Sequence, residues 1–381
     1  MMPIYLDHAA STPLSDATKA YLTPLLDLYG NPSSSHSAGT PVRQLIEDAR
    51  QSVSDFIRAR PEEILFTPSG CAGNTLAVKG LASDDPQKNL YHVFYSPTAH
   101  KSMRAACESC LLHTPLKVHA DGSIDLSALD ALLTQSGTLR PLVCIEAANS
   151  EIGTIQDVRE AGSVTHRHGG ILVVDATGYI PSLPVRMDLW KNDVDILTFS
   201  GHKLHALKGV GVFWKRREIK LNPLIYGSQE QGLIGGTESV LSIASLGKSV
   251  SEYDYTAVSS DNRNFVYDHV TGMIPDCYVI GAPVKSDRRL PQNLYLCFPG
   301  IDGESLMILL DMNGIQVSTG SACNSKTLSA SAVLSAIGLN QKDLRSCIRM
   351  TFSGQETRQQ LDYVCRTMKQ CVAVLRKCGA E

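Results

Sequence analysis

The chain has 381 residues, of which 43% are hydrophobic, and its formal net charge at pH 7 is -3. With 35 Lys and Arg against 38 Asp and Glu, it has no basic excess, which argues against direct binding to nucleic acid. No apolar run approaches the length of a membrane span, and the first residues lack a secretory signal pattern. We therefore expect a cytoplasmic protein of two domains, with a small molecule or a protein as its partner and no membrane contact.

The 11 cysteines are odd in number and scattered along the chain, which does not indicate a disulfide framework. Cys107 and Cys110 form a C-x-x-C pair, but they lie in residues 103–112, whose pattern predicts a helix. No second pair stands at zinc-ligand spacing. The sequence thus favours two helix-packing residues over a redox or metal site, and we expect no metal.

The first long element that the sequence predicts is a helix with Thr40 as its N-cap and Pro41 as its first residue. Apolar residues then recur on one helical face, at Val42, Leu45, Ile46, Ala49, Val53 and Phe56. Short apolar or β-branched runs predict strands at residues 63–67, 90–96, 142–146, 171–175, 195–200 and 209–214. Helical patterns at 72–81 and 158–168 alternate with these strands, which favours an α/β fold with a mainly parallel sheet covered by helices.

The pattern changes after Val250. Residues 255–273 predict a helix, residues 289–298 predict a strand, and a C-terminal helix is expected from Thr357 onward. We interpret this part as a smaller α+β domain. Because ligands of open α/β sheets collect beyond the carboxyl ends of the strands, the polar residues that follow the predicted strands are the candidates for a site.

Lys203 follows the strand predicted at residues 195–200, in the segment Thr198-Phe199-Ser200-Gly201-His202-Lys203. A lysine that is partly desolvated at a strand end has a lowered pKa, as an amine nucleophile requires. Its small and hydroxylated neighbours could hold a phosphate. An isolated segment of this kind is more often a loop lysine beside a turn, so the pattern alone leaves both interpretations open.

Three further features stand at predicted strand ends. Asp175 ends the strand at 171–175, where a carboxylate can pair with the protonated pyridine nitrogen of a cofactor. Residues 67–75 form a turn of small residues from strand into helix, which can bind an anion through backbone N–H groups. His100 follows the strand at 90–96, where an imidazole could stack on a pyridine ring and move protons. Taken singly, these residues are also typical of a helix cap, an ordinary turn and a surface histidine.

Together with four other segments, these residues resemble the NifS/IscS-type cysteine desulfurases, which are pyridoxal-phosphate enzymes of aminotransferase class V. The other segments are Tyr5-Leu6-Asp7-His8-Ala9-Ala10-Ser11-Thr12-Pro13, Gly30-Asn31-Pro32-Ser33-Ser34-Ser35-His36, Asn149-Ser150-Glu151-Ile152-Gly153 and Ser318-Thr319-Gly320-Ser321-Ala322-Cys323. Their order and approximate spacing match from Tyr5 to about Gly354, which is nearly the whole chain. The ordered set is much more specific than any one motif.

The resemblance implies a fold-type I homodimer, in which helices sandwich a mainly parallel seven-stranded sheet and a smaller α+β domain is attached. It implies a large pyridoxal-phosphate domain at residues 14–250, and a small domain of residues 1–13 and 251–381 that carries the catalytic-cysteine loop. The implied reaction converts L-cysteine to L-alanine and leaves the sulfur as a persulfide. An acceptor or scaffold protein would then take the sulfur for iron–sulfur cluster assembly or for thiolation of a nucleic acid or cofactor.

The resemblance also assigns cofactor contacts to single positions. Lys203 would carry pyridoxal 5′-phosphate, Asp175 would pair with its ring nitrogen, and His100 would stack on the ring and handle protons. The phosphate would be surrounded by Gly70, Cys71, Ser200 and His202, and by Thr237 of the partner subunit.

On the substrate side, Arg349 would hold the carboxylate of L-cysteine, with Asn31 nearby, a task suited to a bidentate guanidinium. Cys323 would be the catalytic nucleophile that takes the sulfur, because a thiol in a segment of small polar residues can reach both substrate and acceptor.

The chain departs from the family pattern at five positions near the expected cofactor. In this chain, Ser150 replaces the usual asparagine and Gly178 replaces the usual glutamine. Three further replacements are Ile234 in place of arginine, Cys71 in place of threonine and Ala99 in place of glutamate. Ser150 shortens a cofactor contact, and Gly178 removes a side chain expected to hydrogen-bond the cofactor's phenolic oxygen. We hypothesise a divergent desulfurase with slow intrinsic turnover, an altered substrate or a specialised acceptor.

Two other functions are compatible with the sequence. Another class V enzyme, such as a selenocysteine or C–S lyase or an aminotransferase, would not need Cys323. A non-catalytic homologue acting as a regulatory subunit would need none of these residues, so the presence of Lys203, Asp175 and Cys323 argues against it.

Overall fold

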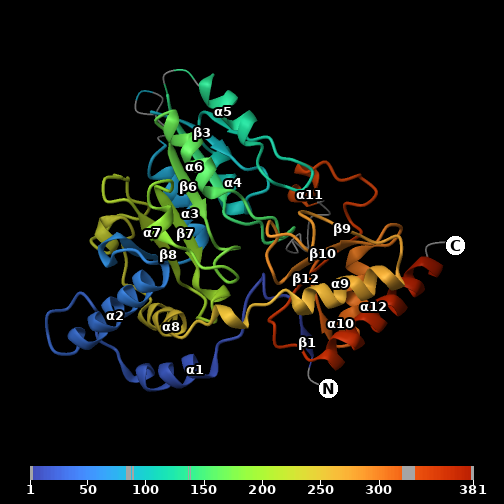
Figure 1. Cartoon of the computed structure of the whole chain (residues 1–381). Coiled ribbons are helices and arrows are strands. Elements are labelled where there is room, and N and C mark those ends of the chain that lie inside the picture. Colours follow the sequence, from blue (N-terminus) through green and yellow to red (C-terminus); the bar gives the residue numbers. More distant parts are fainter. Residues whose placement is uncertain are drawn as a thin grey trace.

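A computed structural model describes residues 3–82, 87, 90–135, 137, 139–319 and 331–378. The chain forms two lobes (Figure 1). The large lobe holds a seven-stranded sheet, and the small lobe holds two short sheets beside the C-terminal helices. Among the described residues, no helix is both long and apolar enough to cross a membrane.

The sheet of the large lobe is parallel except for one strand. Its strands, in spatial order, are β2 (Ile64–Thr67), β8 (Gly211–Lys215), β7 (Ile196–Ser200), β6 (Ile171–Asp175), β5 (Arg140–Glu146), β3 (Tyr91–Tyr95) and β4 (His113–Pro115). Strand β8 runs antiparallel to both of its neighbours, and the pairs from β7 to β4 are all parallel. The predicted α/β fold with a mainly parallel sheet is therefore confirmed, although the edge strand β4 was not among the predicted elements.

Successive residues of the strands enter opposite apolar layers, as the period of two requires. Along β5, Val143 and Ile145 face one helical layer, whereas Leu142 and Cys144 face the other. The first layer contains α2 (Gly39–Ile57), α5 (Leu126–Thr134), α6 (Val158–Arg167), α7 (Met187–Trp190) and α8 (Val240–Ser251). The second contains α3 (Gly70–Lys79) and α4 (Lys101–Glu108). Because both faces are covered, the strands are buried almost throughout, and polar residues gather at their ends.

Two details of the predicted helices were wrong. Helix α2 begins at Gly39, and its N-cap is Ala38, which makes no side-chain capping bond, so Thr40 is not the cap. Pro41 lies in the first turn, where a backbone N–H has no partner within the helix. The proline, which lacks this N–H, therefore breaks no helical hydrogen bond there. Helix α4 ends at Glu108 instead of residue 112. The pair Cys107 and Cys110 is nevertheless buried in the apolar layer over the sheet, as expected for packing residues.

The small lobe is built around β10 (Asn293–Cys297), which lies antiparallel between β12 (Cys347–Thr351) and β9 (Tyr278–Val279). The N-terminal strand β1 (Ile4–Tyr5) pairs in parallel with β11 (Ile315–Gln316). Helices α9 (Asp261–Met273), α10 (Gly303–Met312) and α12 (Arg358–Cys378) cover one face, and α11 (Ala332–Ala336) lies on the other. The predicted helix at 255–273 is split, because a separate turn, η5 (Tyr255–Ala257), precedes α9.

The remaining elements connect these layers. They are α1 (Asp16–Leu22), η1 (Thr23–Asp27), η2 (Pro61–Glu63), η3 (Gly201–Lys203) and η4 (Glu230–Gly232). Helix α1 packs on α8 below the large lobe (Figure 1). The domain boundaries after residues 13 and 250 stay a prediction.

The crossing of α2 and α8 generates a stability prediction. A Cβ on Gly247 would lie 2.6 Å from Ala49 Cα and 2.7 Å from its Cβ, so the two helix backbones leave no room for a side chain. We expect Gly247→Ala to lower the free energy of unfolding by about 1–3 kcal/mol through overpacking.

The matched control is Gly272→Ala in α9, where an added Cβ meets nothing within 4 Å. That change should raise the free energy of unfolding by roughly 0.5–1 kcal/mol, since alanine favours the helix. Urea unfolding followed by circular dichroism measures both variants. A Gly247→Ala protein as stable as the unchanged chain would contradict this helix contact.

Candidate active site

The carboxyl end of β6 carries a buried aspartate that is held by two hydrogen bonds. Asp175 is 5% exposed, and its Oδ2 accepts a bond of 2.8 Å from Asn74 Nδ2. Its Oδ1 accepts a bond of 2.9 Å from the backbone N–H of Thr177. A carboxylate in so dry a place costs free energy unless it is bonded, and these donors fix its orientation. It can therefore offer one defined acceptor to a protonated ring nitrogen.

Asn74 is the residue that connects this aspartate to its surroundings, and the sequence analysis missed it. Its amide also donates to Ser102 Oγ at 3.0 Å and accepts from Thr198 Oγ1 at 2.6 Å. One side chain thus joins α3, α4, β6 and β7. The signal in the sequence is its spacing, since it lies one helical turn after Gly70 and so on the same face of α3.

Lys203 ends the short turn η3, directly after β7, and its partly buried side chain lines a cavity of about 660 Å³. No hydrogen bond or ion pair to its amine is found among the described residues. Burial, together with the positive charge of Arg349, lowers the pKa of Lys203 to about 8, although the charge of Asp175 opposes the shift. A considerable fraction of this amine is therefore neutral and nucleophilic near neutral pH.

The start of α3 forms a cup beside this lysine. The backbone N–H of Gly70 donates to Ser200 Oγ at 3.2 Å, and a Cβ on Gly70 would lie 2.4 Å from that oxygen, so only glycine fits. His202 Nδ1 is buried and has no partner among the described residues. Burial, together with the positive charges of Lys203 and Lys208, lowers the pKa of His202 to about 4.

His100 and Cys71 lie together at the edge of the cup. His100 caps α4, with its Nδ1 2.8 Å from Ser102 Oγ and accepting from the Ser102 N–H at 3.2 Å. Cys71 hydrogen-bonds with His100, and this bond, together with one to Ser102, lowers the pKa of the thiol although burial acts in the opposite direction. The ionised form of Cys71 also interacts electrostatically with Lys203 and Asp175. The structure thus gathers these four predicted residues around one space.

These features fit the expected cofactor. A helix N-terminus and an unsatisfied imidazole nitrogen suit a phosphate group, and an oriented buried carboxylate suits a pyridinium nitrogen. The amine of Lys203, which has no partner among the described residues, lies in the cavity wall. The residues present can therefore hold pyridoxal 5′-phosphate, with the phosphate near Gly70 and Ser200.

Arg349 connects the small lobe to this space. It lies on β12, donates from Nη2 to Asp7 Oδ1 at 2.7 Å and from Nη1 to the Ser150 carbonyl at 3.2 Å. Its Nε is buried and has no partner among the described residues. Asp7 is a second contact that the sequence analysis did not assign, because only the fold brings positions 7 and 349 together. The unsatisfied donor leaves the guanidinium able to bind one more acceptor.

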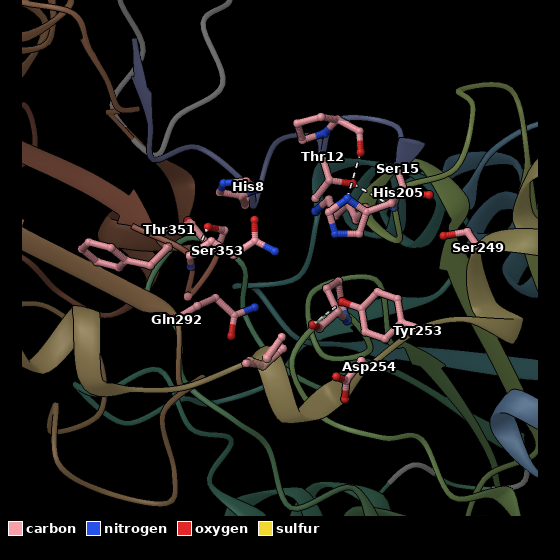
Figure 2. A pocket seen from close by; sticks show the side chains of 18 of the residues that line it. His8, Thr12, Ser15, His205, Ser249, Tyr253, Asp254, Gln292, Thr351 and Ser353 are labelled. Atoms are coloured by element: carbon pink, nitrogen blue, oxygen red, sulfur yellow. Dashed lines mark hydrogen bonds between the residues drawn. The ribbon is translucent and has the colours of Figure 1, made fainter. Parts of the chain in front are cut away.

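The cavity itself lies between the lobes (Figure 2). Thr12, His205 and Tyr253 stand on one side, and Gln292 and Ser353 stand across from them. Lys203, Ser150 and Gly178 line it as well. Most of these side chains are neutral and polar, which suits a small polar substrate.

Lys203 and Ser150 are the predicted site residues that line this cavity, and Asn31 and Thr237 do not line it. The Asn31 Oδ1 accepts from the Ser33 N–H at 2.8 Å, and Thr237 is exposed. Ser33 and Glu238, which lie close to them in the chain, line a second cavity of about 580 Å³. Cys323 lies outside the described residues. The roles of Asn31, Thr237 and Cys323 stay predictions.

Two of the departures from the family pattern have a structural reason. A Cβ on Gly178 would lie 2.5 Å from the Ala148 carbonyl oxygen and 3.4 Å from Ser150 Cβ. The backbone turn after Asp175 therefore packs directly on the segment that contains Ser150, and a glutamine at position 178 would need a different turn. Ile234, where the family has arginine, is 6% exposed and belongs to the apolar layer around α3 and α4.

Comparison with known proteins agrees with this fold. The chain matches the family model Aminotransferase class-V over residues 4–364. A cysteine desulfurase of Nostoc sp. is 34% identical over 99% of this chain and 94% of its own length. Cysteine desulfurase IscS of Dictyoglomus turgidum is 34% identical over 98% of this chain and 95% of its own length.

The solved structures agree with the sequence comparison. A NifS-like protein superimposes with a TM-score of 0.87 at 27% identity, covering 98% of this chain and 100% of its own. A NifS-like protein from Rickettsia africae superimposes with a TM-score of 0.85 at 26% identity, covering 97% of this chain and 99% of its own. These matches confirm the resemblance that the ordered motifs indicated, and the chain belongs to the aminotransferase class-V family.

Proposed function

We propose that this protein is a cysteine desulfurase that uses pyridoxal 5′-phosphate to transfer the sulfur of L-cysteine to Cys323. The observation that carries the proposal is the amine of Lys203, which lines the cavity without a partner among the described residues and has a pKa lowered to about 8. Full-length relatives named cysteine desulfurase support the choice of substrate.

Bound pyridoxal phosphate supplies an aldehyde that condenses with amines and a ring that withdraws electrons from the substrate. The Lys203 Nζ would form the covalent attachment to it and, when free, would accept and return a proton. Asp175, held by Asn74, would pair with the protonated ring nitrogen. The Gly70 N–H, Ser200 and His202 would hold the phosphate, with Cys71 and Ser150 at the edges of the same space.

On the substrate side, Arg349 binds the carboxylate of L-cysteine, and His100 moves protons at the substrate sulfur. The Cys323 thiolate attacks that sulfur, so that an S–S bond forms as the C–S bond of the substrate breaks. The carbon skeleton keeps the electron pair, takes up a proton and leaves as L-alanine. An acceptor or scaffold protein then takes the persulfide sulfur.

The proposal includes a homodimer. Tyr29 and Tyr226 are 90% and 88% exposed, and tyrosine is among the residues enriched at protein–protein interfaces. Thr237 is exposed in the same chain region as Tyr226, as the assigned contact with the partner subunit's phosphate requires. Sedimentation should therefore show a particle of twice the 41.3 kDa chain mass, and a double Tyr29→Ser, Tyr226→Ser variant should shift toward the monomer. A monomeric unchanged protein would contradict this part of the proposal.

The lowered pKa of Lys203 generates a pH prediction. Only the neutral form of an amine reacts with trinitrobenzenesulfonate. The rate at which this reagent modifies Lys203 of the cofactor-free protein should therefore have its pH midpoint at about 8, instead of at the ordinary lysine pKa of 10.5. Because the charge of Arg349 lowers this pKa, Arg349→Met should move the midpoint upward. Peptide mapping at each pH measures the rate, and the exposed Lys101 serves as an internal control. A midpoint for Lys203 equal to that of Lys101 would contradict the shift.

Borohydride reduction tests the cofactor attachment. In the cofactor-loaded protein, reduction should fix the cofactor on the peptide that contains Lys203, and Lys203→Ala should abolish both the tag and desulfuration. The conservative control is Lys208→Ala, since that lysine is exposed five residues away. A tag on another lysine would remove the basis of the proposed function.

The role of Cys323 is tested separately with labelled cysteine. Cys323→Ser should lose the protein-bound label while cofactor binding stays intact, because the thiol is the sulfur acceptor and not a cofactor contact. If this variant still released sulfide and alanine at the unchanged rate, the protein would instead be a C–S lyase of the same family.

A further inference from the structure

Asp7 is an acidic residue that contacts Arg349 directly and has no part in the reaction above. Its side chain is 21% exposed, and its Oδ1 accepts from Arg349 Nη2 at 2.7 Å. Arg349 itself is 7% exposed, so its positive charge lies where there is little water. A buried guanidinium is costly without a counter-charge, and Asp7 provides one. The pair is therefore electrically balanced before any substrate arrives.

The pair lies directly behind the wall of the cavity between the lobes. His8, the residue after Asp7, lines the cavity. So does Ser150, whose carbonyl accepts from Arg349 at 3.2 Å. Burial and the charge of Arg349 lower the pKa of Lys203, while the charge of Asp7 opposes the shift. The carboxylate of Asp7 therefore acts electrostatically on the place where the substrate amine reacts.

The N-terminal segment that carries Asp7 is held at both ends. At one end, the N–H of Thr351 on β12 donates to the Leu6 carbonyl at 2.7 Å, and Asp7 forms an isolated parallel bridge with Thr351. At the other end, Thr12 donates from its N–H and its Oγ1 to the His202 carbonyl, at 3.1 and 3.0 Å (Figure 2). The segment thus runs from β12 to the turn η3, which fixes the carboxylate relative to both sides of the site.

The contacts of Arg349 leave part of its guanidinium for a substrate. Asp7 accepts from Nη2 and Ser150 accepts from Nη1, whereas the Nε–H is buried without a partner among the described residues. A guanidinium binds a carboxylate best through two parallel N–H groups, which requires a defined orientation of its plane. Because the bonds to Asp7 and Ser150 fix that plane, they also fix the direction of the Nε–H.

The charged side chains that line the cavity have no positive excess. The lining acids and lysines among the described residues are Asp16, Glu252, Asp254, Lys19 and Lys203. Lys19 is already bonded to Asp16 at 2.8 Å, and Lys203 is the proposed site of cofactor attachment. Glu151 also interacts with Arg349, and its ionisation makes this region more negative. A ligand with a second carboxylate therefore meets no unpaired cation in the described lining.

We propose that Asp7 is a positioning and specificity-determining residue: it holds the guanidinium of Arg349 in place for one carboxylate, and its charge excludes a second one. The substrate class that follows is an amino acid with a single carboxylate, in preference to a dicarboxylic amino acid. This inference deepens the proposed function and rests on it, because it takes Arg349 as the group that binds the substrate carboxylate.

Asp7→Asn tests the part played by the charge. Asparagine keeps a carbonyl oxygen as an acceptor for Arg349 but is neutral. Equilibrium dialysis of the cofactor-loaded protein with labelled L-alanine and labelled L-aspartate measures both affinities. The unchanged protein should prefer L-alanine, and Asp7→Asn should reduce this preference by roughly five- to tenfold, because the net charge of L-aspartate no longer meets a like charge. L-alanine, whose charges balance, should bind Asp7→Asn as well as it binds the unchanged protein.

Asp7→Ala tests the positioning role. Alanine removes the acceptor together with the charge, so the guanidinium loses one of the bonds that fix its plane. The affinity for L-alanine should fall by roughly five- to tenfold, the size expected for one hydrogen bond to a charged group. KM for L-cysteine should rise by a similar factor while kcat changes little, since the lost contact acts on substrate binding. Asp7→Asn should restore both values, because it restores the acceptor.

The matched control is Asp276→Asn. Asp276 Oδ2 lies 2.7 Å from Arg376 Nη2, so this variant neutralises an aspartate in an ion pair of the same length, outside the cavity lining. It should leave the affinities for both amino acids unchanged.

The two roles of Asp7 and the proposed function can fail separately. An unchanged preference between the two amino acids in Asp7→Asn would overturn the specificity role. Equal affinity of Asp7→Ala and the unchanged protein for L-alanine would overturn the positioning role. If the unchanged protein binds L-alanine but forms no persulfide on Cys323, the proposed function fails while the role of Asp7 in binding the amino acid stands.

Discussion

The bond between Asn74 and the buried carboxylate of Asp175 is the contact on which the site depends. When a parallel sheet is covered on both faces, little water reaches a carboxylate at the end of a strand. A hydrogen-bond donor of the protein therefore has to take the place of water. Asn74 provides that donor. Its side-chain amide also donates a hydrogen bond to Ser102 on α4 and accepts one from Thr198 on β7. The same contact therefore fixes the start of α3, the cap of α4 and the strand that leads to Lys203.

The small lobe completes the site through a second set of contacts. Arg349 reaches from β12 to the Ser150 carbonyl of the large lobe and to Asp7 of the N-terminal segment. Its charge lowers the pKa of Lys203 and also acts on Glu151. The same charge therefore makes the amine of Lys203 easier to deprotonate and the carboxyl group of Glu151 easier to ionise.

The sequence predicted what depends on local pattern. Buried strands such as Ile171–Asp175 were recognisable because both of their faces are apolar. Once the strands were placed, the polar residues at their carboxyl ends could be predicted as candidates for the site. The edge strand His113–Pro115 was missed because exposed, short and proline-containing strands lack that signal. The N-cap at Thr40 was wrong because the chain before it is already helical at Ala38. Pairs such as Asp7 with Arg349 are set by tertiary contacts between distant segments, which no periodicity records.

The segment from Asn149 to Glu151 shows why single substitutions in this family are hard to interpret. Asn149 stabilises its turn by accepting the N–H groups of Glu151 and Ile152 and by donating to the Thr98 carbonyl. The Ser150 carbonyl then accepts a hydrogen bond from Arg349, and Glu151 Oε1 accepts one from Ser331 Oγ. The serine at position 150 keeps the backbone bond to Arg349 and permits the close approach of Gly178. The backbone course of this segment, more than the side chain at position 150, is what the neighbouring groups require.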